Sequence, residues 1–312
     1  MAVRASIASR LNLPAGRLAR REALVGVLLV MPWFVGFLVF LLGPMLVSVY
    51  LSFTDWDLLT PAKFVGLKNY RKMIFEDPLI KQALKVTTIY AFSAVPLRVV
   101  GGLLLAVLLN QNIKLKSFIR TVFYLPSVVS GVAVAMLWLW IFNSDFGLLN
   151  LILNLFGISG PAWLSDTRYV LAAFVIMSLW GVGGSMVIYL AGLQGVPTDL
   201  YEAAEVDGAN SLTRFWYITL PMISPVIFFN LVMSIIAALQ IFNQAYIMTQ
   251  GGPQNASMFM MLYLYFNAFE YFKMGYASAL AWLIFFYILA LTLLVFRSSS
   301  HWVFYTGSVR GK

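Results

Sequence analysis

The chain has 312 residues, of which 61% are hydrophobic and only 11% are charged, so it is far more apolar than an ordinary soluble domain. We therefore expect an all-α membrane protein. The formal net charge is +9, but the basic residues form no stripe, so nucleic acid is not expected as a partner. With no cysteine and a single histidine, His301, the sequence excludes a disulfide framework and predicts no ordinary metal site.

Residues 1–22 form a basic tail, which we expect to lie at the anionic inner leaflet and to be partly disordered. The uncharged runs that follow reach the roughly 20 residues that a helix needs to cross a bilayer, and they predict six spans within residues 23–297. The spans are expected near residues 24–51, 83–109, 120–142 and 169–194, then in a segment that ends near 242, and at 276–296. Residues 298–312 form a second tail.

Prolines and turn signals refine these spans. Pro32 and Pro44 favour a kinked or tilted first span, and its length indicates a retained helix rather than a cleaved signal peptide. In the second half, the turn signal QGGPQNAS at residues 250–257 interrupts a long uncharged run. The aromatic stretch 259–272 is too short to span, so we interpret it as an interfacial outer helix, with a short seventh span as the alternative.

The distribution of lysine and arginine predicts the orientation. Six spans place both termini on one side, where the connecting segments and tails hold twelve of the 21 basic residues against eight on the other side. With the acidic residues included, the net charges of the two sides are about +7 and +1. Both the N and the C terminus are therefore expected to be cytoplasmic.

Several kinds of chemistry are missing from the sequence. Its only Gly-Lys pair is Gly311-Lys312 at the end of the chain, so there is no P-loop for ATP. No Asp, Glu or His lies within a predicted span, although proton- and ion-coupled carriers usually need such groups. No catalytic constellation is visible either. We therefore expect a protein that is not an enzyme and that takes its energy from a partner.

Arg98 is a charged side chain well inside the second predicted span. One interpretation is a residue of a transport pathway or of a subunit interface, facing the interior of the bundle. The alternative is a structural arginine that binds backbone carbonyls or extends toward the inner surface.

The inner segment 195–219 is acidic and broken by glycine, unlike the basic surface around it. Asp199 and Glu202 are spaced for a capping box at the start of a short helix, and Gly208 is suited to end it in the left-handed conformation. One face of this helix carries Leu200, Ala203, Ala204 and Asp207, and its two alanines permit close approach of another surface. That surface is either a partner protein or the chain's own bundle.

The same segment resembles the EAA loop of the permeases of ABC importers. Glu202-Ala203-Ala204, Gly208 and Ile218-x-Leu220-Pro221 match the pattern E-A-A-x(3)-G-x(9)-I-x-L-P at every spacing. Further stretches are similar to the carbohydrate-uptake branch, which includes maltose-type and glycerol-phosphate-type permeases, and to the first, GGP-containing permease of its pairs. These stretches are FVGLKNY (64–70), FYLPSVVSG (123–131), FNSDFG (142–147), TQGGP (249–253) and GYASAL (275–280).

The resemblance implies a type I ABC importer with a six-helix permease bundle in a bacterial or archaeal plasma membrane. The implied partners are the lipid bilayer, a second homologous permease, two ATPase subunits that hold ATP and Mg, and an external solute-binding protein. This chain itself is expected to hold no cofactor. The segment 195–219 then corresponds to the coupling loop, whose implied ATPase-coupling residues are Glu202, Ala203, Ala204, Asp207, Gly208, Leu220 and Pro221.

The expected solute is a sugar or oligosaccharide. The alternative within the class is glycerol phosphate or a related phosphodiester, with Arg98 as the partner of the anion. Alternatives from other classes are a stand-alone secondary carrier and a membrane enzyme, both disfavoured by the missing chemistry described above. Copurification with an ATPase distinguishes the importer from these two.

The resemblance places the solute pathway on the third, fourth and fifth spans, near the middle of the membrane. Residues there offer hydrogen-bonding groups and an aromatic face, the mixture that sugars need. The candidates are Ser127, Gly131, Trp180, Gly181, Gly184, Ser185, Ser234, Gln240 and Asn243. The alternative is that Trp180 and its neighbouring glycines only pack helices. The outer segments 52–82 and 250–272 are expected to receive the binding protein, or else to contact lipid headgroups.

Overall fold

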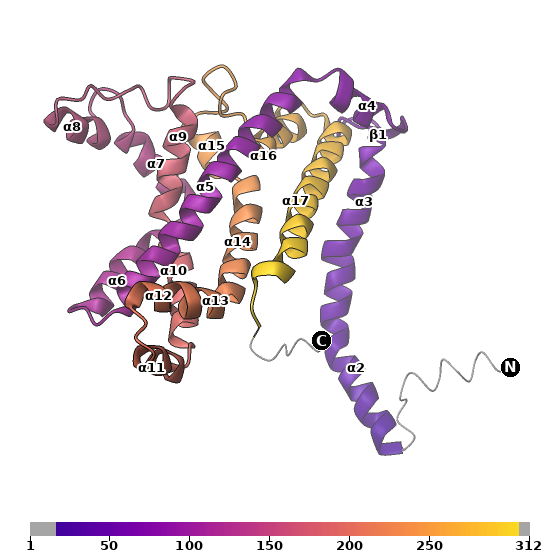
Figure 1. The fold of residues 1–312 in the computed structure, drawn as a ribbon. Coiled ribbons are helices and arrows are strands. Elements are labelled where there is room, and N and C mark those ends of the chain that lie inside the picture. The colour runs from indigo at the N-terminus through magenta and orange to yellow at the C-terminus, as the bar shows by residue number, and fades with distance from the viewer. Residues whose placement is uncertain (1–16, 306–312) are drawn as a thin grey trace.

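The structure is a computed structural model that describes residues 17–305, and it is mainly helical. Of the two predicted tails, residues 1–16 and 306–312 lie outside the described residues, whereas residues 17–22 open the first helix and residues 298–302 close the last one. Figure 1 shows the start of α2, the short helix α11 and the end of α17 at the same end of the molecule, with α4 and α8 at the other end.

The first span is one long helix made of α2 (Arg17–Phe37), a π-helical turn (Leu38–Leu42) and α3 (Gly43–Ser52). Proline cannot donate the backbone hydrogen bond of a regular turn. The chain accommodates Pro44 through the π-helical turn directly before it, so the helix continues across this proline. The α3 half packs on the rest of the described chain, mainly against α17, where Trp282 Nε1 donates to Ser48 Oγ at 3.1 Å.

The outer segment between the first two spans contains regular structure. The strands β1 (Thr54–Asp55) and β2 (Lys63–Phe64) form an antiparallel pair in which Thr54 lies opposite Phe64, and α4 (Lys68–Phe75) follows. The amide of Asn69 on α4 donates to the carbonyls of Ser52 at 3.0 Å and Thr54 at 2.8 Å. This polar segment is therefore fixed to the outer end of α3.

The second span, α5 (Pro78–Asn110), is a 33-residue helix that begins five residues before the predicted start. Asp77 sets its beginning by accepting a hydrogen bond from the backbone N–H of Leu79 at 3.0 Å. The same carboxylate accepts hydrogen bonds from the hydroxyls of Tyr263 and Tyr276, both of which are buried. Burial, together with the bond to Asp77, raises the pKa of Tyr263 above its ordinary value, so this phenol remains a donor.

Two of the predicted spans consist of two helices that meet at a bend of more than 40°. The third consists of α6 (Lys116–Tyr124), a 3₁₀ turn (Leu125–Ser127) and α7 (Gly131–Ile141), with a bend of 97° between its halves. Our expectation of one helix over 120–142 is therefore wrong, because the chain turns after Pro126 and Ser130 caps a new helix. The fourth consists of α9 (Val170–Trp180) and α10 (Gly183–Gln194), with a bend of 46°.

The outer loop between these two broken spans carries α8 (Leu148–Leu155). Asn150 holds the loop together, since its amide donates to the carbonyls of Ser144 and Pro161 and accepts from Trp163 Nε1 at 2.7 Å. Gly160 lies so close that a Cβ there would approach Asn150 to 2.0 Å. A side chain at this position would break the contact.

The second half of the chain begins with the inner segment and continues into the fifth span. The inner segment holds α11 (Thr198–Val206), α12 (Ser211–Arg214), a π-helical turn (Phe215–Thr219) and α13 (Leu220–Met222). The fifth span is α14 (Ser224–Leu239), followed after a break at Gln240 by α15 (Asn243–Met248).

The aromatic stretch 259–272 forms α16 (Met260–Tyr265) and a π-helical turn (Phe266–Glu270), and α17 (Met274–Trp302) is the last span. Phe259, Met260 and Leu262 are almost completely buried, and Phe259 packs edge-on against Tyr90 and Phe174. The stretch therefore packs into the outer core up to Ala268, whereas residues 269–272 are exposed. Its position at the membrane interface stays a prediction.

Within the described residues, four helices are long and apolar enough to cross a membrane, and the two bent pairs bring the number to six if each pair is one span. α5 packs against α9, α10 and α14 and so lies at the centre of the bundle. At its inner end, Ala106 and Leu109 form an apolar cluster with residues of α10 and with Ile223.

We expect the replacement of Asp77 by alanine to destabilise the outer end of the bundle. The helix cap is worth about 1 kcal/mol, and each buried tyrosine hydroxyl left without its acceptor costs about 1–3 kcal/mol more. The midpoint of thermal unfolding of the purified protein in detergent should fall. The matched control is Glu76→Ala, an exposed neighbouring acid. Equal midpoints for the two variants would show that Asp77 does not hold these helices together.

Candidate functional site

A cleft of about 380 Å³ lies where three broken helices meet. The first break separates the 3₁₀ turn after α6 from α7, the second separates α9 from α10 at Gly181, and the third separates α14 from α15 at Gln240. Residues from all three breaks line the cleft, and α5 forms another wall. Non-helical backbone is tolerated inside a membrane only where protein or a cavity satisfies it, so the breaks and the cleft belong together.

The lining combines polar and aromatic groups. Its apolar part consists of Pro126, Val129, Val134, Met177, Ala237, Ile241 and Phe242 with the glycines 131 and 181. Its polar part consists of the side chains of Tyr90, Arg98, Ser178, Gln240, Asn243 and Gln244, beside the indole of Trp180. Amides and hydroxyls hydrogen-bond sugar hydroxyls, and an aromatic ring packs against the C–H face of a sugar. The arrangement fits a polyhydroxylated solute.

The structure places some of the predicted pathway residues on this cleft and others elsewhere. Those on it are Gly131, Trp180, Gly181, Gln240 and Asn243. Those outside its lining are Ser127, Gly184, Ser185 and Ser234.

The residues outside the lining serve the packing and local geometry of the helices. Ser127 Oγ donates to the carbonyl of Tyr124 at 2.6 Å. Ser185 Oγ donates to the carbonyl of Val182 at 2.8 Å and lies where a Cβ on Gly102 would approach it to 2.4 Å. Small residues allow such close contact between helices. Ser234 is buried within α14.

Sequence reasoning missed three polar residues of the lining, Tyr90, Ser178 and Gln244, as well as its apolar side chains. Gln244 follows Asn243 directly, and Ser178 precedes Trp180 by two positions, so proximity to the predicted residues is a usable signal for both. Tyr90 lies on α5, eight residues before Arg98, which was the one residue of this span considered for the pathway. Eight residues are about two helical turns, and both side chains reach the same wall of the cleft.

The inner segment forms the second candidate site. The end of α11 is as predicted, with Gly208 in the left-handed conformation at φ +79°. Two backbone hydrogen bonds close the helix: Ala209 N donates to Ala204 O at 2.8 Å, and Gly208 N donates to Glu205 O at 3.0 Å. Its start differs from the prediction. The helix begins at Thr198, after Pro197, with no side-chain cap, so Asp199 and Glu202 form no capping box. Asp199 lies in the first turn, where a negative charge favours the helix dipole.

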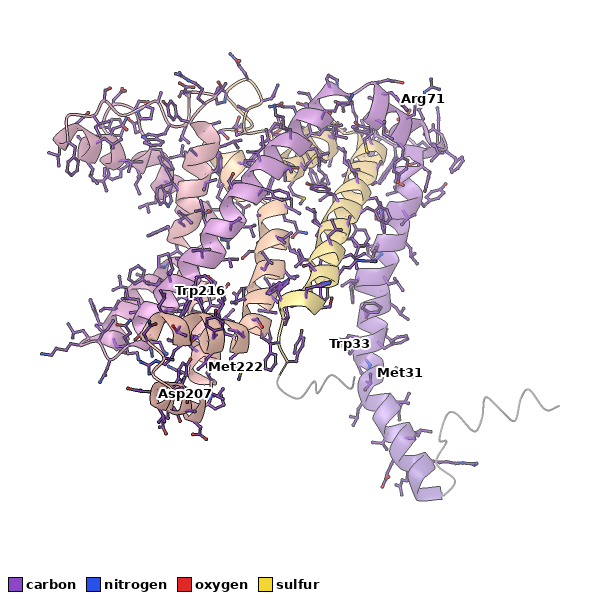
Figure 2. The ribbon with its side chains drawn as sticks, in the orientation of Figure 1. Met31, Trp33, Arg71, Asp207, Trp216 and Met222 are labelled. Atoms are coloured by element: carbon purple, nitrogen blue, oxygen red, sulfur yellow. The ribbon has the colours of Figure 1, made fainter. Side chains whose placement is uncertain are left out.

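α11 projects from the inner end of the molecule. Figure 2 labels Asp207, the residue directly after this helix, at the opposite end of the protein from Arg71. No residue of α11 is buried, Val206 is 88% exposed, and Glu202 forms no hydrogen bond or ion pair with the described residues. On the face with Leu200, Ala203, Ala204 and Asp207, the residues Ala203 and Asp207 are exposed, Leu200 is 40% exposed and Ala204 is partly covered. The chain's own bundle therefore leaves much of this face open.

Two contacts attach α11 to the bundle. Tyr201 packs its ring on the inner apolar cluster, and its hydroxyl lies 2.9 Å from Thr219 Oγ1. The exposed carboxylate of Glu205 pairs with Arg214, with 2.9 Å between Oε2 and Nη1. The predicted residues Leu220 and Pro221 form α13, which joins this region to α14. Neither Tyr201 nor Thr219 was a predicted site residue.

The second half of the EAA pattern has a structural explanation here. Ile218, on the π-helical turn, packs on the inner apolar cluster together with Tyr201. Ser224 Oγ donates to the carbonyl of Pro221 at 2.6 Å, which fixes the short turn between α13 and α14. The pattern therefore describes both an exposed helix and the buried support below it.

Residues 98–302 match the family model described as "Binding-protein-dependent transport system inner membrane component", which covers more than half of the chain. The chain belongs to this family. It is a multi-pass membrane permease, the noncatalytic subunit of an ABC importer, and not a stand-alone carrier or an enzyme. The loop resemblance at Glu202 therefore identified the correct class.

Individual relatives agree with this assignment over almost the whole chain. The "Probable ABC transporter permease protein YesP" of Bacillus subtilis is 44% identical over 93% of this chain and 94% of its own length. The "Trehalose/maltose transport system permease protein MalF" of Thermococcus litoralis is 33% identical over 90% and 95%. A crystal structure of a bacterial ABC transporter "involved in the import of the acidic polysaccharide alginate" matches the fold, with a TM-score of 0.79 at 23% identity over 90% of this chain and 96% of that one.

We expect Tyr201→Ala to loosen α11. A nine-residue helix is marginal in water by itself, and this change removes both its apolar anchor and its hydrogen bond to Thr219. Hydrogen exchange of the α11 amides should become faster by about tenfold or more. The control is Tyr217→Ala, which removes a ring that is 80% exposed and should leave the exchange unchanged. Unchanged exchange in Tyr201→Ala would mean that other contacts hold the helix.

Proposed function

We propose that this permease takes up a sugar or oligosaccharide that an external solute-binding protein delivers, and that it pairs with a second homologous permease and two ATPase subunits. The observation that carries the proposal is the cleft at the three helix breaks, whose amides, hydroxyls and indole suit sugar hydroxyls and C–H groups. The name of the Thermococcus relative, a trehalose/maltose permease, supports the same class of solute.

In this proposal, α11 is the coupling helix that one ATPase subunit receives. Its exposed small face, with Ala203 and Ala204, permits close approach of a partner, and Glu202 is an unpaired acceptor for a basic group there. ATP and Mg are held by the ATPases, and this chain needs no cofactor. The start of α2, α11 and the end of α17 lie at one end, which agrees with cytoplasmic termini on the more basic side.

Two structural routes connect α11 with the cleft. Through Thr219, α11 contacts the segment that continues into α13 and α14, and α14 ends at Gln240 in the cleft. Through the ring of Tyr201, α11 contacts the inner ends of α5 and α10, and these two helices lead to Arg98 and to the break at Gly181. A movement of the ATPases that displaces α11 would thereby shift helices in two walls of the cleft, and alternating access requires such a shift.

The outer segments 52–82 and 250–272 form the proposed docking surface for the binding protein. They lie at the end of the molecule opposite α11, and in residues 52–82 the bases of α4 are flanked by acids on both sides, among them Asp55 and Glu76. Mixed charges suit a reversible contact that weakens with salt. A screen of sugars against the purified binding protein tests the proposed class of solute, and a protein that binds no sugar would contradict it.

Glu202→Lys and Gly208→Val should uncouple transport. The first places a cation where a basic partner group is expected, and a like-charge contact costs several kcal/mol of docking energy. The second forces a β-branched residue into φ +79°, which costs about 1 kcal/mol or more without any steric clash. Solute uptake and its stimulation of ATPase activity should fall in vesicles that contain the complete importer.

The control for this pair is Glu22→Lys, the same charge change at an exposed acid on α2, outside the coupling helix. All three proteins should insert and assemble to the same level in the membrane unless the ATPase subunit is lost. Wild-type uptake and stimulation in both α11 variants would show that this helix is ordinary surface.

Gln240→Leu should lower solute uptake by about tenfold, because it removes an amide from the cleft and leaves hydroxyl groups of the solute without a partner. Asn154→Leu is the matched control, since it makes a similar change at an exposed amide on α8, outside the cleft. If the two variants transport the solute equally well, the cleft at the helix breaks is not the solute site.

A further inference from the structure

Arg98 is an unpaired cation in the wall of the solute cleft. It is half-buried on α5, and it makes no hydrogen bond or ion pair with any residue that the structure describes. The structural interpretation of this residue requires an arginine that binds backbone carbonyls. Arg98 makes no such bond to the described residues. Its guanidinium remains available to whatever enters the cleft.

Nothing in the described part of the chain compensates this charge. The cleft is lined by no aspartate or glutamate, and Arg98 is its single ionisable cation. The acidic residues that the structure describes lie at the two ends of the bundle. Asp77 at the start of α5 and Glu205 on α11 are examples. The local field of the cleft is therefore positive.

The position of Arg98 also argues against extension to the inner surface. Twelve residues separate it from Asn110, the last residue of α5, which corresponds to about 18 Å along the helix. An arginine side chain does not cover that distance. A guanidinium carries a fixed charge in proteins, so this charge must be stabilised where it is, by water or by a ligand in the cleft.

On the basis of the proposed sugar uptake, we infer that the solute is a saccharide with an anionic group, a carboxylate, sulfonate or phosphate, and that Arg98 binds this group. The planar guanidinium matches two oxygens of such a group with two parallel hydrogen bonds. Gln240, Asn243 and Gln244 lie in the same cleft and serve the sugar hydroxyls. The cleft thus combines one site for charge with several for hydroxyl groups.

The first experiment identifies the charge of the solute. The purified solute-binding protein is tested by calorimetry against matched probes: uronate-containing disaccharides, their carboxyl-reduced neutral counterparts, a sulfonated sugar and glycerol 3-phosphate. Binding of a saccharide probe that carries an anionic group supports the inference. Binding of neutral sugars alone overturns it but leaves sugar uptake intact. Binding of glycerol 3-phosphate alone, or of none of the probes, overturns the proposed sugar uptake as well.

The second experiment tests the residue. Uptake of the anionic probe is measured in vesicles with the complete importer and saturating loaded binding protein, for the wild type, Arg98→Gln, Arg98→Lys and Lys85→Gln. Lys85 is an exposed cation on the same helix, outside the cleft, and serves as the matched control. We expect about a tenfold loss or more in Arg98→Gln. Arg98→Lys should retain a substantial part of the uptake, and Lys85→Gln should not change it.

The remaining alternative is that an acidic group of the partner permease, and not the solute, is the counterion of Arg98. Measuring the assembly of the importer distinguishes the two. The amount of complete complex is measured for each variant by copurification of the partner permease. Normal assembly with lost uptake in Arg98→Gln supports the anion site. Loss of the partner permease from that variant, or undiminished uptake of the anionic probe, overturns it.

Discussion

The arrangement of this protein depends on the requirement that every backbone N–H and C=O group within a bilayer be satisfied. An intact helix meets the requirement by itself, whereas a broken helix meets it only where protein or a cavity surrounds the break. Three spans break, after Ser127, at Gly181 and at Gln240, and all three breaks line one cleft. The backbone constraint therefore concentrates polar groups at one place inside an otherwise apolar bundle.

The unbroken helix α5 connects the functional regions. Asp77 fixes its outer end to α16 and α17 through two tyrosine hydroxyls. Its middle supplies Tyr90 and Arg98 to the cleft, and its inner end packs in the apolar cluster that holds Tyr201. A displacement of α11 therefore acts on a helix that also borders the cleft and the outer surface. This continuity is the physical basis of the coupling that we propose between ATPase and solute.

Sequence reasoning succeeded where the signal is local. The apolar runs predicted the long apolar helices, because the bilayer demands about 20 apolar residues wherever a helix crosses it. Gly208 predicted the end of α11, because its positive φ is a property of one residue. Local sequence does not decide an outcome that depends on a distant neighbour. The stretch 259–272 is apolar and aromatic throughout, and only the packing of Phe259 against Tyr90 and Phe174 shows that its first part belongs to the core.

The sequence by itself determined the membrane class, the EAA loop and a set of polar residues in the third, fourth and fifth spans. Only the tertiary structure decided which of these residues share a cleft. Ser185 and Gly181 are four positions apart, yet Ser185 packs against Gly102 while Gly181 lines the cleft, because the helix bends between α9 and α10. Such a bend depends on contacts between distant segments, and no short window of sequence contains them.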